Sequence, residues 1–139
     1  MAAYNKFNVF VADRANKVHN LGSDTLKIML TNAAPVATNA VKADITEIAA
    51  GNGYSAGGLS VTGITSSQTG GTYKLISSAD PVLTASGSVG PFRYAVFYNS
   101  TPAAGPLIAW WDYGSSITLA SGDTLTIDLD QVNGIFQDN

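Results

Sequence analysis

Few side chains in this sequence could perform catalytic or metal chemistry. The chain has one histidine, His19, and no cysteine, so a Ser-His-Asp triad would have to use His19. That residue lies beside Asn20 at the polar end of a predicted helix, and no G-x-S-x-G motif supplies a nucleophile. We therefore expect a surface or helix-terminal histidine. Because there are no thiols and only one imidazole, zinc is not expected, and we predict no cofactor.

Carboxylate pairs are the other possible source of chemistry, because two suitably spaced acids can hydrolyse a glycosidic bond. Glu47 is the one glutamate among the ten acidic residues. Asp112 has the most distinctive setting, in the run WWDYG, where aromatic neighbours could desolvate its carboxyl group and raise its pKa. The favoured alternative is a structural acid that caps a turn before Gly114. We predict that the protein is not an enzyme.

Two segments match ligand-binding motifs only in part. Residues 51–56 (GNGYSA) fit the loose dinucleotide pattern G-x-G-x-x-A, but Gly57 and Gly58 follow where that motif needs a helix. Residues 128–134 (DLDQVNG) faintly resemble a calcium loop, with the wrong spacing and no closing glutamate. We expect an ordinary loop at the first segment and no metal site at the second.

The aromatic residues are more informative. Trp110 and Trp111 are adjacent, so in a strand their side chains must point to opposite faces. One can fill the core, and the other then faces a partner, unless the strand is covered on both sides. Large aromatic side chains outside a core are typical anchors of protein interfaces. An exposed Trp110 and Tyr113 could also stack on a sugar ring. The candidate interface residues are Trp110, Trp111, Tyr113, Phe97, Phe92 and Tyr98.

Composition argues against several classes of partner. The net charge is −3, only 12% of the residues are charged, and the seven basic residues are scattered along the chain. Nucleic acid needs clustered Lys and Arg that displace counterions, so we predict no nucleic-acid partner. No stretch approaches the ~20 apolar residues of a membrane helix, and the N-terminus lacks the apolar core of a signal peptide. We predict no membrane partner, and synthesis and folding in a cytoplasm.

Hydrophobic periodicity predicts one helix and one strand in the first part of the chain. Residues 4–20 have apolar side chains near i, i+3, i+4 spacing, which predicts a helix with Asn5 as N-cap and Gly22 at the stop. Arg14 interrupts the apolar stripe, and local alternation makes a strand the alternative. Residues 25–31 alternate as a half-buried strand, with Leu26, Ile28 and Leu30 on one face. Residues 32–44 predict a long loop, and residues 44–50 one helical turn.

From residue 59 onward, short strands alternate with Gly- and Ser-rich turns. The predicted strands cover residues 59–65, 72–76, 81–85, 92–99, 107–113, 117–119 and 124–130, and a tight turn at Asn133–Gly134 precedes Ile135 and Phe136. Strands at roughly 8–12-residue spacing, without helices between them, predict an antiparallel β-sandwich or jelly roll with one N-terminal α-helix. We predict a single domain over residues 1–139, with a helix, a strand and long loops in 1–58 and the β-rich core in 59–139.

Several runs of this sequence resemble small structural proteins of tailed bacteriophages. They are GPFRYAVFYN (90–99), PLIAWWDYGSSITLASGDTLTIDLD (106–130) and NGIF (133–136). The front of the chain, from KFNVFVADRANKVHN to GNGYSAGG (6–58), is similar to the same group. The resemblance covers nearly the whole chain and contains no catalytic signature.

Within such virions, the role that the resemblance implies is that of a capsid decoration, or cement, protein. A protein of this kind binds the outside of the capsid and bridges neighbouring major capsid proteins. The resemblance therefore implies the major capsid protein as partner, self-association as a homodimer or homotrimer, and a place on the outer capsid surface of the virion after synthesis in the host cytoplasm. The alternative function is that of a tail or fibre component that binds a host receptor or a glycan.

Overall fold

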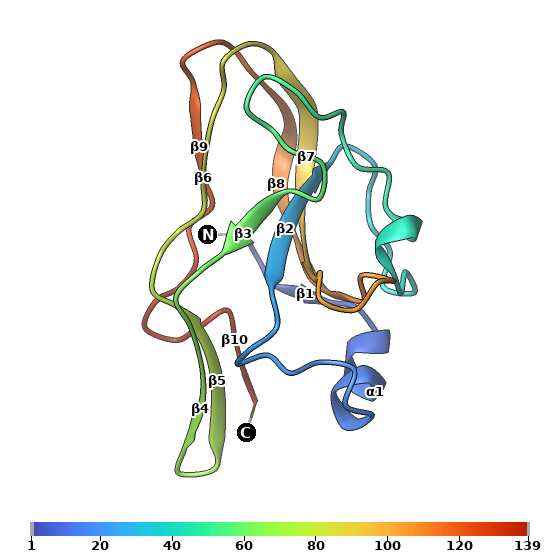
Figure 1. Cartoon of the computed structure of the whole chain (residues 1–139), viewed down its shortest axis with the longest axis vertical. Helices are drawn as coiled ribbons and strands as arrows, with labels where there is room; N and C mark the ends of the chain where they lie inside the picture. The colour runs from blue at the N-terminus through green and yellow to red at the C-terminus, as the bar shows by residue number, and fades with distance from the viewer. Residues whose placement is uncertain (1, 139) are drawn as a thin grey trace.

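The computed structural model describes residues 2–138, which form β-strands with one short α-helix at the lower edge of the molecule in Figure 1. The mainly β architecture, with antiparallel sheets packed together and one N-terminal helix, confirms the predicted fold class. In chain order the elements are β1 (Asn5–Lys6), α1 (Val9–Ala15), β2 (Leu26–Thr31), the 3-10 helix η1 (Lys42–Asp44), β3 (Leu59–Val61), β4 (Ile64–Thr69), β5 (Thr72–Ser77), β6 (Val82–Thr84), β7 (Val89–Asn99), β8 (Leu107–Leu119), β9 (Thr124–Thr126) and β10 (Phe136–Asp138).

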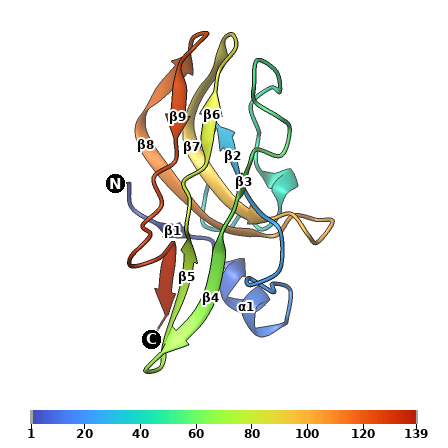
Figure 2. The same ribbon diagram turned by 60° about the vertical axis from the view of Figure 1, so that its left-hand side comes forward.

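The strands form three antiparallel sheets. The largest has five strands in the order β1-β8-β7-β2-β3, so the front and the rear of the chain build it together. The three-stranded sheet β10-β5-β4 and the two-stranded ribbon β6-β9 pack against one face of it. In Figure 1 the ribbon lies in the upper part of the molecule, and the β4–β5 hairpin extends at its lower end. Figure 2 shows the ribbon stacked over β7 and β8.

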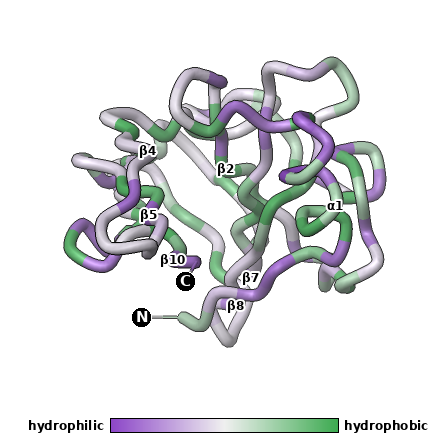
Figure 3. Tube along the Cα trace, turned by 90° about the horizontal axis from the view of Figure 1, so that it is seen from below, coloured by the Kyte–Doolittle hydropathy of each residue, from purple (hydrophilic) through white to green (hydrophobic). Residues whose placement is uncertain are grey.

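Strand β2 is buried on both faces, so the half-buried strand predicted from its alternation is wrong. Leu26 and Ile28 pack toward the smaller sheets, whereas Met29, on the opposite face, packs with Phe7. Thr31 is fully buried as well, because its hydroxyl donates to the Thr46 carbonyl at 2.5 Å. The second face is covered by the N-terminal segment and by the loop between β2 and β3, residues 32–58, which we call the covering loop. Figure 3 shows apolar stretches gathered around β2 and α1.

Hydrogen bonds from tyrosine side chains hold this covering loop on the sheet. The Tyr54 hydroxyl accepts from the Leu30 N–H at 3.0 Å and donates to Glu47 Oε1 at 2.8 Å. Glu47 Oε1 also accepts from the Gly57 N–H at 2.7 Å, and the Tyr98 hydroxyl donates to the Gly57 carbonyl at 2.6 Å. Burial raises the pKa of Tyr54 far above its usual value, so the phenol keeps the proton that it donates. The one glutamate of the chain thus fixes a loop.

The α-helix is shorter than the predicted 4–20, because the residues before it belong to the sheet. Asn5, the predicted N-cap, pairs with Trp110 in strand β1. The Phe7 N–H then donates to the Ile108 carbonyl at 3.0 Å, so helical geometry begins only after it. At the other end, Lys17 has a φ of 63°, a left-handed conformation that ends helices.

Arg14, which interrupts the apolar stripe of the predicted helix, is paired in the structure. Its Nη2 lies 2.6 Å from Asp138 Oδ2. Its guanidinium carbon lies 5.4 Å from the ring centroid of Phe10 and 5.9 Å from that of Phe136. A cation over aromatic rings packs almost as an apolar side chain does, so Arg14 docks α1 against β10.

Most of the later strands lie where periodicity places them, with different ends. The segments predicted separately at 107–113 and 117–119 are one strand, β8, and the segment predicted at 124–130 shortens to β9. The helical turn predicted in 44–50 lies earlier, in η1. The Asp44 carboxylate accepts a hydrogen bond from the Ala40 N–H at 2.8 Å. The helical turn therefore lies before Asp44, whereas the prediction placed it after Asp44.

Gly58 is the closest approach between the covering loop and the sheet. Its φ is +87°, and a Cβ there would collide with the backbone of Ile28 and Met29. Gly122 has a similar φ of +89°, but a Cβ added there would have no atom within 4 Å. We expect Gly58→Ala to lower the free energy of unfolding by more than about 3 kcal/mol, because conformational strain and a backbone clash add, and Gly122→Ala by about 1–2 kcal/mol. Chemical denaturation measures both, and equal losses would contradict the close approach.

Candidate functional site

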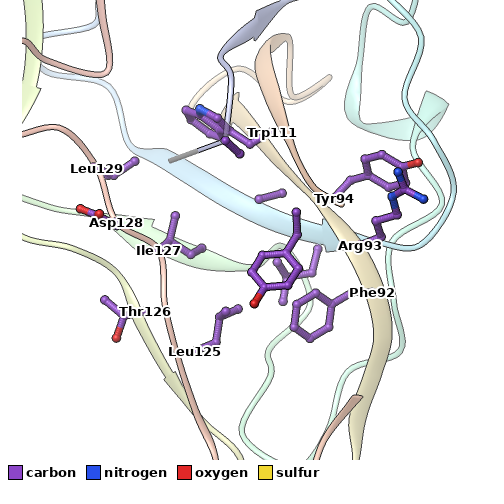
Figure 4. Close-up of a pocket in the computed structure, with 13 residues that line it drawn as sticks. Phe92, Arg93, Tyr94, Trp111, Leu125, Thr126, Ile127, Asp128 and Leu129 are labelled. Carbon is purple, nitrogen blue, oxygen red and sulfur yellow. The ribbon is translucent and has the colours of Figure 1, made fainter. Parts of the chain in front are cut away.

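An apolar cavity of about 220 Å³ lies between the five-stranded sheet and the segment that follows β9. Figure 4 shows its two sides: Leu125, Ile127 and Leu129 come from β9 and the residues after it, and Phe92 and Trp111 come from β7 and β8. An apolar cavity of about 150 Å³ is enough to bind benzene. This cavity is therefore large enough for one aromatic ring or one branched aliphatic side chain.

An ion pair lies on the opposite face of the sheet from the cavity, where Asp112 alternates with the cavity residues Trp111 and Tyr113. Arg93 donates from Nε and Nη2 to the two carboxylate oxygens of Asp112 at 2.7 and 2.9 Å. Its guanidinium carbon lies 5.4 Å from the ring centroid of Tyr94, and Figure 4 shows both side chains on the other side of β7 from Phe92. Asp112 Oδ1 also accepts from the Gly114 N–H at 2.8 Å. The Arg93 side chain, and after it the Gly114 N–H, hold the pKa of Asp112 below its usual value. The hypothesis that aromatic neighbours raise this pKa is wrong, because the carboxylate is partly exposed and paired. Asp112 has a structural role, as the alternative predicts, but it lies within β8 and not at a strand end before a turn.

A bulge in β8 places Tyr113 at the cavity. Tyr94 pairs with Asp112 and Phe92 pairs with Ile117, so Arg93 alone lies opposite residues 113–116. Extra residues in one strand make it bend away from its partner. Tyr113 is 65% exposed and also lines the cavity. Its ring is therefore available to a molecule that approaches the cavity from solvent.

Trp110 and Trp111 lie on opposite faces of the sheet, as their adjacency predicts, and both are partly buried. The ring centroid of Trp110 lies 4.6 Å from that of Phe7, and that of Trp111 lies 6.0 Å from that of Tyr4. This is the alternative in which the strand is covered on both sides. Trp111 lines the cavity with Tyr113, whereas Trp110 faces the other way. A sugar-stacking surface built from Trp110 and Tyr113 is therefore not assembled.

The other three candidate interface residues are core residues. Phe97 is fully buried, and Phe92 and Tyr98 are 3% and 2% exposed. Both faces of β7 are covered, so its alternating aromatic residues all point into the protein. Phe92 reaches only the inner wall of the cavity, and Tyr98 holds the covering loop. We therefore leave these three out of the candidate interface, which consists of Trp111 and Tyr113 at the cavity and Trp110 on the opposite face.

The two partial motifs form turns. Gly51 and Tyr54 exchange N–H···O bonds of 2.8 and 3.1 Å, as expected for a loop at 51–56. Asp130 accepts from the backbone N–H groups of Val132 and Asn133 at 2.9 and 2.7 Å, so it closes a turn. Within residues 2–138, no three His, Cys, Asp or Glu side chains group in a way that could hold a metal ion. Over the same residues, no helix is long and apolar enough to cross a membrane.

His19 lies in a polar cluster where the chain from α1 meets the end of β7, and it is half-buried rather than on the surface. Its Nδ1 is 3.1 Å from Asn99 Nδ2, which also donates to Asp24 Oδ2 at 2.6 Å. Its ring packs edge-on against Phe10 at 5.2 Å. Within the described chain, His19 Nε2 is buried without a hydrogen-bond partner. Burial lowers the pKa of His19, against the opposing effect of the Asp13 and Asp24 charges.

The cavity wall after β9 is the part of the site that the sequence pattern does not predict. Leu125, Ile127 and Leu129 alternate as in a strand, but the strand ends at Thr126. Beyond it, the Ile127 N–H donates to the Pro81 carbonyl at 2.9 Å, and the Leu129 N–H donates to Asp80 at 3.0 Å. The Ile127–Pro81 bond keeps the register of the β6–β9 ladder, whereas the Leu129 bond goes to a side chain, so regular backbone pairing ends between them. A local pattern identifies the apolar side chains but not the space that they leave.

Comparison of the chain with known protein families, with curated proteins and with solved structures finds no significant match in any of the three.

The two tryptophans and Tyr113 should differ in their effect on folding. We expect Trp110→Ala and Trp111→Ala each to lower the free energy of unfolding by about 2–4 kcal/mol, because each ring packs against a core cluster. Tyr113→Ala should change it by less than about 0.5 kcal/mol, because most of that ring is in solvent. Urea denaturation of the three variants measures this difference. A loss in Tyr113→Ala as large as in the tryptophan variants would place its ring in the core.

The folding stability should depend on pH through His19. Its pKa in the folded state lies below its ordinary value of 6.5, so the unfolded chain takes up a proton first as the pH falls. The free energy of unfolding is therefore highest above pH 6.5 and decreases as the pH falls toward the folded-state pKa. His19→Asn, which does not titrate, should flatten this slope between about pH 7 and pH 5. An unchanged slope would assign the pH dependence to other groups.

Proposed function

We propose that this chain is a structural protein of a tailed-phage virion, which binds the outside of the capsid and cements neighbouring major capsid proteins. The observation on which this proposal depends is the apolar cavity with the exposed Tyr113 beside it. The runs at 90–99 and 106–130, which resemble phage structural proteins, include β8, β9 and all of β7 except Val89. These strands and the residues after β9 contribute both walls of the cavity. The residues of the resemblance therefore coincide with the site.

The cavity suits an apolar side chain of a protein partner. Such a side chain would leave water and contact Leu125, Ile127 and Trp111, and burial of this kind concentrates binding energy at a few positions. Tyr113 flanks the cavity, and Tyr is enriched among residues that dominate interfaces.

The weakly charged surface supports the same role. Stable attachment needs on the order of 1,000 Å² or more of buried area. Only 12% of the residues are charged, so an area of this size can be covered without burying many ions, which would be costly. Neutral polar side chains such as Ser and Thr can instead hydrogen-bond across the contact.

The alternative function is a tail or fibre component that binds a host receptor or a glycan, and one observation favours it. Trp111 and Tyr113 line the cavity together. Aromatic side chains commonly line small-ligand sites. In this alternative, a sugar ring would stack on Tyr113.

The number of copies per particle distinguishes the two functions. We expect quantitative mass spectrometry of purified virions to find on the order of hundreds of copies per head, because a symmetric capsid repeats every binding site. Tyr113→Ala should weaken binding to heads that lack the protein by about tenfold or more, because Tyr is a typical interface anchor. Val132→Ala, at a residue 76% exposed, is the matched control and should bind as the wild type does.

A few copies per particle would contradict the cementing role. Combined with a glycan-array signal that Tyr113→Ala abolishes, that result would favour the tail or fibre component instead.

A further inference from the structure

Strand β4 is an open edge of the three-stranded sheet β10-β5-β4. Its residues from Thr65 to Thr69 are all exposed, and the β4–β5 hairpin extends at one end of the molecule in Figures 1 and 2. Edge strands of soluble proteins are usually protected by Lys, Pro, a bulge or short length. Strand β4 runs for six residues, ITSSQT, in regular register with β5 and has none of these protections.

The backbone groups that face outward from β4 follow from the turn of the hairpin. Thr69 pairs with Thr72 across the two-residue turn Gly70–Gly71, and a pair that closes such a turn exchanges its hydrogen bonds. Bonded pairs alternate along an antiparallel ladder. The bond from the Ser78 N–H to the Gly63 carbonyl, 3.0 Å, follows the same alternation at the far end. The N–H and C=O groups of Ser66 and Gln68 therefore point away from β5.

We propose that β4 pairs edge to edge with β4 of a second copy of this chain. The two strands run antiparallel about a two-fold axis, with Ser66 opposite Ser66 of the second copy and Ile64 opposite Gln68. This register uses the outward-facing groups of Ile64, Ser66 and Gln68 on both copies and forms about six N–H···O bonds. A two-fold contact of this kind is self-complementary and closed, so it stops at a dimer.

The side chains of β4 permit this pairing. Thr65 of one copy lies opposite Ser67 of the other, and Thr and Ser pairs across antiparallel strands can hydrogen-bond. The strand has no charged residue, so two copies do not bring like charges together, although each has a net charge of −3. The partner that fits an uncharged, self-complementary edge is therefore the same edge.

The other sheet edges of the described chain are less suitable. Strand β10 has three residues and ends near Asp138, which pairs with Arg14. Strand β3 also has only three residues, and so does each strand of the ribbon, β6 and β9. The outer edge of β8 is partly covered by β1 and then interrupted by the bulge at 113–116. Strand β4 is the one long, regular and uncharged edge among them.

Analytical ultracentrifugation of the full chain over a range of concentrations tests this pairing, independently of any capsid role. The wild type should change from monomer to dimer as its concentration rises. Ser66→Pro removes the outward N–H without breaking a bond to β5, a position where an edge strand tolerates proline, and should weaken dimerisation at least tenfold. Ser66→Ala loses the same hydroxyl, with its 2.8 Å bond to Tyr73, but keeps the N–H and should dimerise as the wild type does.

Gln137→Pro, on the opposite edge of the same sheet, should also leave dimerisation unchanged. If Ser66→Pro does not fold, hydrogen exchange of the wild type replaces it: the amides of Ser66 and Gln68 should become protected as the concentration rises, and the amide of Gln137 should not. A wild type that stays monomeric, or a Ser66→Pro that dimerises as Ser66→Ala does, would overturn the proposal. A monomer that protects these amides only on phage heads would indicate pairing with a strand of another protein.

Discussion

The burial of one sheet on both of its faces is the constraint on which the rest of this structure depends. Strands β2 and β7 carry apolar side chains on both sides, so two covers are needed. The smaller sheets and the ribbon supply one cover with apolar side chains. The other cover includes a loop rich in small residues, which is held by the hydrogen bonds of Tyr54, Glu47 and Tyr98. These bonds satisfy backbone groups at Leu30 and Gly57 that would otherwise be buried unpaired at a cost of about 1–3 kcal/mol each.

This double cover explains which predictions from the sequence succeed. Alternation identifies most of the strands, and their spacing predicts the antiparallel fold class, because both signals are local. Whether a polar residue within a strand faces solvent is not local. Thr31 alternates with apolar residues and is buried because Thr46, far along the chain, accepts its hydroxyl proton. The aromatic residues of β7 show the same limit of local patterns. The alternation of Phe92, Phe97 and Tyr98 suggests an exposed aromatic face, but segments distant in the sequence bury all three.

The candidate site arises where the cover is incomplete. The ribbon β6-β9 is short, and the chain leaves β9 after Thr126, while β8 bulges outward at residues 113–116. The cavity lies between these two irregularities. The sequence contains a sign of the second one, since Gly114 and the two serines after it are weak strand formers. It contains no comparable sign of the first, because the apolar alternation continues through Leu129 while the Leu129 N–H donates to the Asp80 side chain instead of a backbone group of the ribbon.

The acidic residues of this chain serve mainly to hold its turns and loops. Seven of the ten acidic residues accept a hydrogen bond from a backbone N–H and so hold turns or loops: Asp24, Asp44, Glu47, Asp80, Asp112, Asp123 and Asp130. Arg93 and Arg14 are paired with acids as well. Charges engaged in this way stabilise local structure, and none of them lies on β4, whose sequence ITSSQT is uncharged. That strand therefore lacks the charged side chains with which soluble proteins usually protect an edge.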